Sequence, residues 1–156
     1  MDITTLTLFH TGVSFLALAF GIVAIRSYFA ATPSLWTNVF LVLDIIVVIT
    51  GFMFPFKGFT PAIGTGIAAS IILVLMLIGR FAFDLSGVWR KVYALGLVVN
   101  VFFLVLVTIA QSFNKLPPLH ELAPNGNEPP FGVAQLINLA VFAFVGFKVW
   151  RQLRRA

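Results

Sequence analysis

Five long apolar stretches constrain the fold of this chain more than any other feature. Each holds close to the roughly 20 residues that a helix needs to cross the hydrocarbon of a bilayer. Their apolarity is continuous, without the period-two alternation of barrel strands, so helices are favoured. The stretches lie at approximately residues 6–30, 35–54, 61–83, 89–113 and 131–150. The sequence therefore predicts an all-α integral membrane bundle of five transmembrane helices, in a single domain over residues 1–156.

The composition requires lipid as the solvent for most side chains. Apolar residues make up 60% of the chain and charged residues only 10%, whereas a soluble domain typically has about 25% charged residues. We therefore expect the lipid bilayer as a partner. The net charge of +5 would also suit nucleic acid, but the basic residues lie at the ends of the apolar stretches, as membrane insertion favours. We expect no nucleic-acid binding.

The positive charges indicate how the chain is oriented. Five spans place the termini on opposite sides, and a cytoplasmic C-terminus puts eight of the ten Lys and Arg residues inside, as the positive-inside rule favours. These eight are Arg26, Arg80, Arg90, Lys91, Lys148, Arg151, Arg154 and Arg155. An alternative with four spans and one re-entrant segment would place basic clusters on the wrong side. The sequence predicts an external N-terminus and a cytoplasmic C-terminus.

The longest connection between the spans is predicted to be an external, Pro-rich loop over residues 114–130. It contains five prolines, and their spacing predicts an irregular surface loop without a helix. Two roles stay open for this loop, a plain connector and a surface on which a partner docks.

Polar residues inside the spans are candidate functional residues, because each one is costly to insert. Asp44 lies mid-way along the second span, and Asn100 lies at a comparable depth on the fourth. Arg80, near the end of the third span, could reach Asp44 or pair with Asp84 at i,i+4 spacing. Two interpretations stay open. Asp44 is either a proton or cation site with Asn100 beside it, or one half of an interhelical clamp with Asn100 or Arg80.

A second group of polar residues lies in the outer half of the spans at matching depths. One interpretation is that the first, fourth and fifth spans converge on a polar pocket open to the exterior. The other is that the histidine lies in the headgroup region and the remaining side chains satisfy one another. The group consists of His10, Ser14, Gln111, Gln135 and Asn138.

The chain lacks the sets of residues from which catalytic and cofactor sites are built. The chain has no Cys, which excludes thiolate metal sites and disulfides. Its two histidines, His10 and His120, are awkward haem ligands, because His120 lies in the predicted loop. A ligand set of these two with Glu121 and Glu128 has no recognised spacing. We expect no metal, no cofactor and no enzymatic activity.

Two short motifs lie at the first span and before the last one. They are Leu8-Phe9-His10-x-Gly12, and the stretch from Lys115-Leu116-Pro117 to Glu128-Pro129-Pro130-Phe131. With them, the layout of most of the chain resembles uncharacterised bacterial multi-span inner-membrane proteins. The resemblance implies a multi-pass protein of a bacterial inner membrane, and it implies no role for any single residue.

These observations favour an accessory or interaction protein that packs against other membrane subunits, since little of the chain lies outside the spans. The alternative is a small transporter or proton-coupled permease that uses Asp44 and the other intramembrane polar residues. Five helices leave little room for a gated path, so this alternative would require a homo-oligomer. A third, remote alternative is a haem-binding redox protein.

Overall fold

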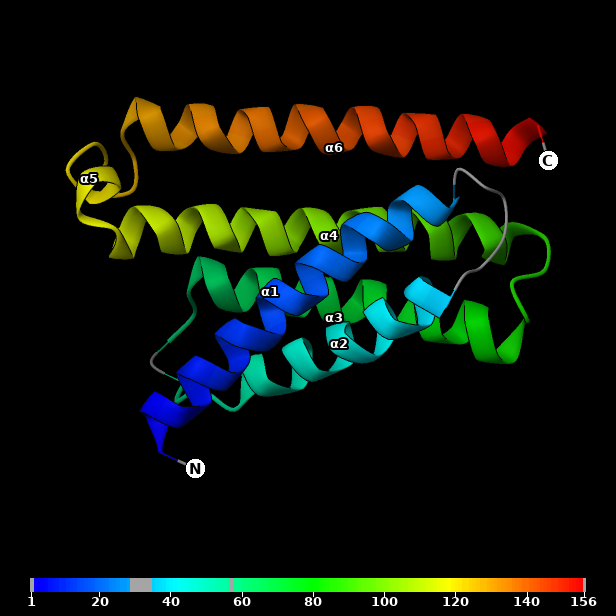
Figure 1. The fold of residues 1–156 in the computed structure, drawn as a ribbon, viewed down its shortest axis with the longest axis horizontal. Coiled ribbons are helices and arrows are strands. Elements are labelled where there is room, and N and C mark those ends of the chain that lie inside the picture. Colours follow the sequence, from blue (N-terminus) through cyan, green and yellow to red (C-terminus); the bar gives the residue numbers. More distant parts are fainter. Residues whose placement is uncertain (1, 29–34, 57, 156) are drawn as a thin grey trace.

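A computed structural model describes residues 2–28, 35–56 and 58–155 (Figure 1). Over these ranges the chain has no strand, and five of its helices are long and apolar enough to cross a membrane. The predicted all-α fold with five such helices is therefore confirmed. The helices are α1 Ile3–Tyr28, α2 Leu35–Phe52, α3 Pro61–Leu77 with the π-helical turn η1 Ile78–Ala82, α4 Val88–Lys115, α5 Pro117–His120 and α6 Pro129–Arg155.

The helices differ from the predicted spans mainly at their ends. Helix α6 continues to Arg155, five residues past the predicted end at 150. Arg and Gln are good helix formers, so the helix continues where the apolar run stops. At the other end, α1 begins three residues before the predicted span. Residues 29 and 30, which end the predicted first span, lie outside the described residues.

The Pro-rich connection contains one turn of helix, which the sequence analysis did not expect. Helix α5 spans Pro117–His120, with Pro117 and Pro118 in its first turn. Proline is compatible with a first turn because the N–H group that it lacks would have no partner inside the helix. The expectation of a loop without a helix was therefore wrong over these four residues.

Two helix starts are capped by side chains. Asp2 precedes α1, and its carboxylate accepts a hydrogen bond of 3.0 Å from the Thr5 N–H. Hydrogen bonding to Thr5 lowers the pKa of Asp2 below its usual value. Thr60 caps α3 by accepting from the Ile63 N–H at 3.3 Å, directly before Pro61 in the first helical position.

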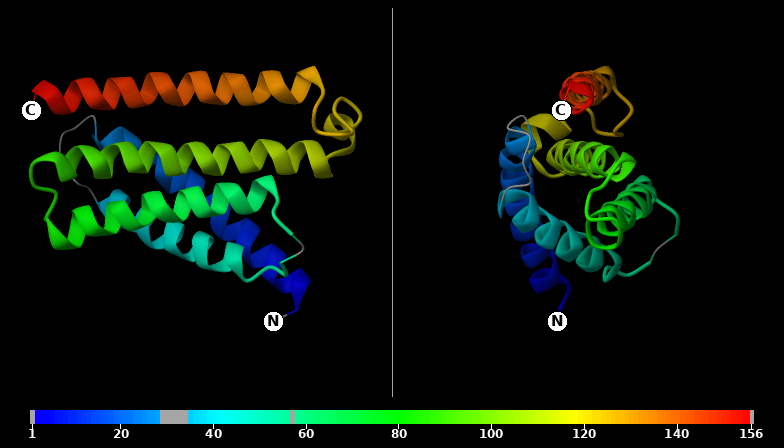
Figure 2. Two further views of the ribbon diagram at one scale, coloured as in Figure 1. Left: turned by 180° about the vertical axis from the view of Figure 1, so that it is seen from behind. Right: turned by 90° about the vertical axis from the view of Figure 1, so that its right-hand side faces the viewer.

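Helices α1, α2, α3 and α4 form a closed ring in which each packs against the next, and α1 also packs against α4. Helix α2 therefore lies diagonally opposite α4. Helix α6 lies outside the ring and packs against α4 (Figures 1 and 2). The two ends of the chain lie at opposite ends of the bundle, as an odd number of crossings requires.

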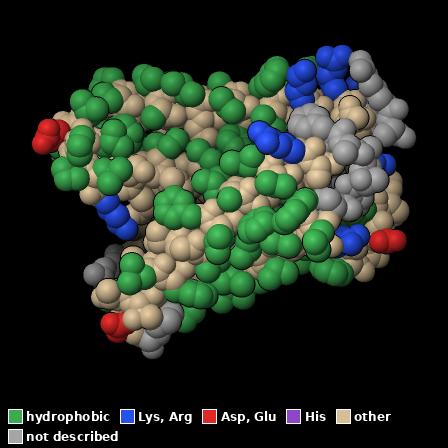
Figure 3. Space-filling model, in the orientation of Figure 1, with side chains coloured by type: hydrophobic (Ala, Val, Ile, Leu, Met, Phe, Trp, Pro, Cys, Tyr) green, Lys and Arg blue, Asp and Glu red, His purple; other side chains and the backbone are tan. Residues whose placement is uncertain are grey.

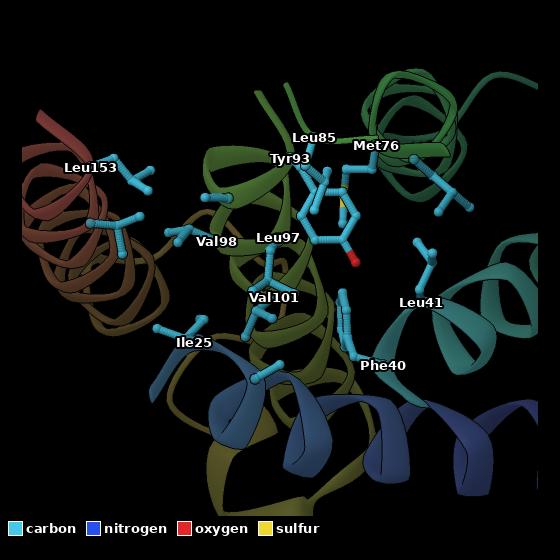
Figure 4. Packing of buried hydrophobic residues seen from close by; sticks show 14 residues of the cluster. Ile25, Phe40, Leu41, Met76, Leu85, Tyr93, Leu97, Val98, Val101 and Leu153 are labelled. Atoms are coloured by element: carbon cyan, nitrogen blue, oxygen red, sulfur yellow. The ribbon is translucent and has the colours of Figure 1, made fainter. Parts of the chain in front are cut away.

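The core lies inside the ring, on the inner face of α4. Tyr93, Leu97 and Val101 from α4 are fully buried there, together with Phe40 from α2 and Met76 from α3 (Figure 4). These three α4 residues are four apart, so they form one face of the helix.

Two glycines bring the ring helices into close contact. A Cβ atom at Gly96 of α4 would lie 2.7 Å from Met76 Cγ. A Cβ atom at Gly21 of α1 would lie 2.5 Å from Val101 Cγ2 and 2.9 Å from Phe40 Cε2. All three distances are too short for a real Cβ atom, so a side chain at either position would force its neighbours to shift where these helices approach one another.

Positive charge gathers at one end of the bundle. In Figure 3 the Lys and Arg side chains lie mostly at the end that carries the C-terminus, while the surface between the two ends is largely apolar. We call this the basic end. Helices α1 and α6 and the segment α3–η1 end there, and α4 begins there (Figure 1), so the described basic residues near these helix ends belong to it: Arg26, Arg80, Arg90, Lys91, Lys148, Arg151 and Arg154.

Candidate functional site

Asp44 and Asn100 meet at the centre of the four-helix ring. Asn100 Nδ2 donates a hydrogen bond of 2.6 Å to Asp44 Oδ2, across the diagonal between α2 and α4. Asp44 is 2% exposed and Asn100 is 1% exposed, so the pair is shielded from its surroundings. A buried carboxylate needs a hydrogen-bond donor, and Asn100 supplies one.

The pair is enclosed by side chains from three helices. Asn100 Nδ2 also lies 3.9 Å from Met76 Sδ, on α3. Thr37 and Tyr93 are both fully buried. Thr37 lies seven residues before Asp44 on α2, and Tyr93 lies seven residues before Asn100 on α4. Tyr93 interacts with Thr37 and lies within electrostatic range of Asp44. Because α2 and α4 run in the same direction and seven residues make two helical turns, Thr37–Tyr93 forms a second polar level beside Asp44–Asn100.

Arg80 lies near this cluster but does not pair with Asp44. Its guanidinium nitrogen Nη1 lies 3.9 Å from Asp84 Oδ1, in the turn between α3 and α4. Asp84 is almost fully exposed, so this ion pair contributes little to stability. The sequence left two partners open for Arg80, and the structure places Asp84, the one at i,i+4 spacing, next to it.

The region around Asp44 is densely packed. Two surface hollows of the described residues lie elsewhere: one is formed by residues 38–43 of α2 and one by residues 70–75 of α3. Both are lined by a single helix, and neither includes Asp44 or Asn100. The buried pair can hold α2 and α4 at a fixed distance.

His10 has a partner that the sequence analysis missed. Its Nδ1 atom lies 2.8 Å from Thr50 Oγ1 of α2, and its ring packs edge-on against Phe54 at 5.4 Å between centroids. The Thr50 hydroxyl also donates to Ile46 O at 2.7 Å within its own helix. Thr50 is 6% exposed, so this contact fixes α1 against α2 in the half of the bundle away from the basic end.

The five residues of the predicted outer pocket do not come together. Helix α4 separates the N-terminal part of α1 from the start of α6 (Figures 1 and 2). His10 and Ser14 lie on α1, and the Ser14 hydroxyl donates to His10 O at 2.7 Å. Gln111 is exposed near the end of α4. The convergence of three spans on one pocket is therefore not observed.

Gln135 and Asn138 of α6 face α4 instead. Gln135 Nε2 donates to Leu106 O at 3.0 Å, while its Oε1 atom has no partner among the described residues. Asn138 is 5% exposed, and neither polar atom of its amide has a hydrogen-bond partner among the described residues. The α4–α6 contact thus contains polar atoms that this arrangement of the helices leaves without partners.

The two histidines lie on separate elements, His10 on α1 and His120 at the end of α5. Within the described ranges, no group of three or more His, Cys, Asp and Glu side chains is arranged to hold a metal ion. Comparisons with protein-family models, with curated proteins and with solved structures found no match to this chain.

Proposed function

We propose that this protein is an accessory subunit of a bacterial inner membrane, which packs against another membrane protein through helix α6. In this proposal the N-terminus is external and the basic end is cytoplasmic. The positive-inside rule supports the orientation, because the basic side chains gather at one end of the bundle.

The observation that carries the proposal is the buried, hydrogen-bonded state of the carboxylate. An ion or proton pathway needs a carboxylate that water can reach, whereas Asp44 is 2% exposed and bonded to Asn100 at 2.6 Å. Asn100 donates to it from α4, the helix opposite α2 in the ring, and Met76 of α3 contacts Asn100. This geometry favours the interhelical clamp over the transport site.

Helix α6 is the element proposed to contact the partner. It packs against α4. In an apolar stretch of 18 residues, only 6% of α6 is buried inside the protein, compared with 39% for such a stretch of α4. Helices in lipid associate through close packing rather than through the hydrophobic effect. A helix with one main neighbour therefore keeps most of its packing surface for a second membrane protein.

Site-specific photo-crosslinking in native membranes tests this proposal. A photoreactive residue at Ile137 of α6, which is 59% exposed, should give one discrete adduct with a second membrane protein. The matched control is Ile71 of α3, which is 57% exposed and should give lipid adducts alone. Adducts at Ile137 that contain only lipid, or only a second copy of this chain, would refute the proposed docking role of α6.

The transport alternative predicts a different result for Asp44→Asn. If Asp44 carried ions, this variant would remain folded and lose pH-dependent uptake in proteoliposomes. We expect the wild-type protein to show no such uptake, so that the variant changes only stability. Uptake that Asp44→Asn abolishes would overturn the proposed function in favour of a transporter.

A further inference from the structure

The ends of α4 and α6 bring two cations to one tryptophan at the basic end. Trp150 of α6 has Lys91 Nζ of α4 at 5.3 Å from its ring centroid, and Arg154 Cζ of α6 at 5.7 Å. Helices α4 and α6 run antiparallel, so the start of one meets the end of the other. A single indole ring thus connects a cation from each helix.

The packing of α6 fixes the position of this ring. Val149 is 2% exposed and Leu153 is 9% exposed, and both belong to the same buried cluster as Val98 of α4. Trp150 follows Val149 directly and remains 37% exposed, so it lies at the edge of the contact between the two helices. Tryptophan favours such a position at the level of lipid headgroups.

Among the described residues, no acidic side chain neutralises these two cations. Arg80 pairs with Asp84, in the turn between α3 and α4. Neither Lys91 nor Arg154 forms an ion pair with an acidic side chain in the part of the chain that the structure describes. Their charge therefore complements an anion that comes from outside the chain.

We propose that Lys91, Arg154 and Trp150 form a binding site for the phosphate of an anionic phospholipid, at the basic end of the α4–α6 contact. Basic side chains between transmembrane helices provide the charge that anionic headgroups need. The indole ring holds both cations at headgroup level. This site is independent of the proposed accessory function, because it requires only a bilayer.

The same helix provides a matched control on another face. Lys148 lies over Phe144 at 5.4 Å, and Arg151 lies over Phe147 at 5.7 Å. Phe144 is 61% exposed and Phe147 is 55% exposed, so these cations stack on rings that face away from α4. They carry the same charge in the same segment of α6, without a contribution from α4.

Native mass spectrometry of the full-length protein in micelles tests the site, with phosphatidylglycerol and phosphatidylcholine as probes. The wild-type protein should retain phosphatidylglycerol in preference to phosphatidylcholine. The variant Lys91→Gln/Arg154→Gln should weaken phosphatidylglycerol binding by about tenfold or more, because two cations near the headgroup are lost. The variant Lys148→Gln/Arg151→Gln should weaken it by less than about twofold.

Three outcomes would overturn the proposal. The first is an equal loss in both double variants, which would mean diffuse attraction to the basic end. The second is equal retention of the two lipids by the wild-type protein. The third is displacement of phosphatidylglycerol by inorganic phosphate at equal concentration, which would mean a site for free phosphate. If Lys91→Gln/Arg154→Gln fails to fold, Trp150→Leu, which keeps both cations, should still lower phosphatidylglycerol binding relative to Lys148→Gln/Arg151→Gln.

Discussion

Two buried asparagines, Asn100 in the ring and Asn138 on α6, show how differently the two parts of the molecule are held together. Asn100 is 1% exposed and donates to Asp44 at 2.6 Å, whereas Asn138 is 5% exposed and has no hydrogen-bond partner among the described residues. The Asn100 amide thus makes a hydrogen bond between the ring helices, where only its Oδ1 atom has no partner among the described residues, whereas the Asn138 amide makes none between α4 and α6. The ring has the features of a fixed unit, and α6 those of a helix whose packing can change.

Removing the asparagine that is hydrogen-bonded to Asp44 should have the largest effect. In Asn100→Leu, Asp44 loses its donor where it cannot reach water, and we expect the free energy of unfolding to fall by about 2–3 kcal/mol. This exceeds the roughly 0.6 kcal/mol that an interhelical hydrogen bond contributes on average in a membrane, because a buried carboxyl group is left unpaired. Reversible unfolding in mixed micelles measures the change.

The double variant Asp44→Leu/Asn100→Leu is the control for this prediction. It removes both polar groups, so it should recover part of the stability that Asn100→Leu loses. If Asn100→Leu were as stable as the wild-type protein, the pair would not be a clamp and the contrast with Asn138 would disappear.

Close packing offers a second way to test the difference between the ring and α6. In Gly21→Ala the new Cβ would lie 2.5 Å from Val101 Cγ2, and we expect a loss of about 1–2 kcal/mol through overpacking. In Gly146→Ala of α6 the nearest atom would be Val98 Cγ1 at 3.9 Å, so this variant should gain a few tenths of a kcal/mol from helix propensity, as an order of magnitude. Equal effects in the same unfolding assay would show that both contacts are equally tight.

Much of the ring could be predicted from the sequence, because hydropathy reports which segments are buried and how deep each residue lies. Asp44 and Asn100 could be matched because they lie at comparable depths on the second and fourth spans. The partner of Arg80 was ambiguous, because Arg80 could pair with Asp44 on another span or with Asp84 at i,i+4 spacing. Only the structure places Asp84 beside it, at 3.9 Å.

The neighbours of the outer polar residues could not be predicted, because depth does not report which helices lie side by side. His10 and Gln135 were expected at similar depths, yet α4 separates the N-terminal part of α1 from the start of α6. The partner of His10 was missed for a related reason. A Thr in a helix ordinarily bonds the carbonyl four residues earlier, as Thr50 does with Ile46, and nothing in the sequence marks it for a second contact. Its depth, equal to that of His10, was the one usable signal.

Removing the unsatisfied asparagine should have a smaller effect, of opposite sign. In Asn138→Leu an amide without protein partners is replaced by an apolar side chain of similar size, and we expect a gain of about 1 kcal/mol. The same unfolding assay measures it, with Asn100→Leu as the comparison at a similarly buried site. A loss of stability in Asn138→Leu would show that the amide has a partner beyond those described, and that α6 is as fixed as the ring.

Changes in the connection that leads into α6 should have the smallest effect on stability. Glu128 accepts hydrogen bonds from the Asn125 side chain at 2.8 Å and from the backbone N–H groups of Asn125 and Asn127 at 3.1 and 3.0 Å. Desolvation acts to raise the pKa of Glu128, but these hydrogen bonds outweigh it and lower the pKa below its usual value. Because the pKa of Glu128 is lowered in the folded state, its carboxylate stabilises this connection at a pH above the usual glutamate range. The stabilisation is lost as the pH falls through the folded-state pKa.

Hydrogen exchange of the backbone amides in this connection measures the effect. Glu128→Gln should increase exchange at residues 125–128 at neutral pH, since the amide is a weaker acceptor than the carboxylate. In the wild-type protein the same amides should lose protection on acidification below the ordinary glutamate pKa of about 4. Glu121→Gln is the control, because the Glu121 side chain is exposed and makes no hydrogen bond among the described residues. Exchange inside α6 should not change in either variant. If Glu128→Gln also loosened α6, the position of that helix would depend on its leading turn as well as on α4, and the ring would no longer be the only rigid support for it.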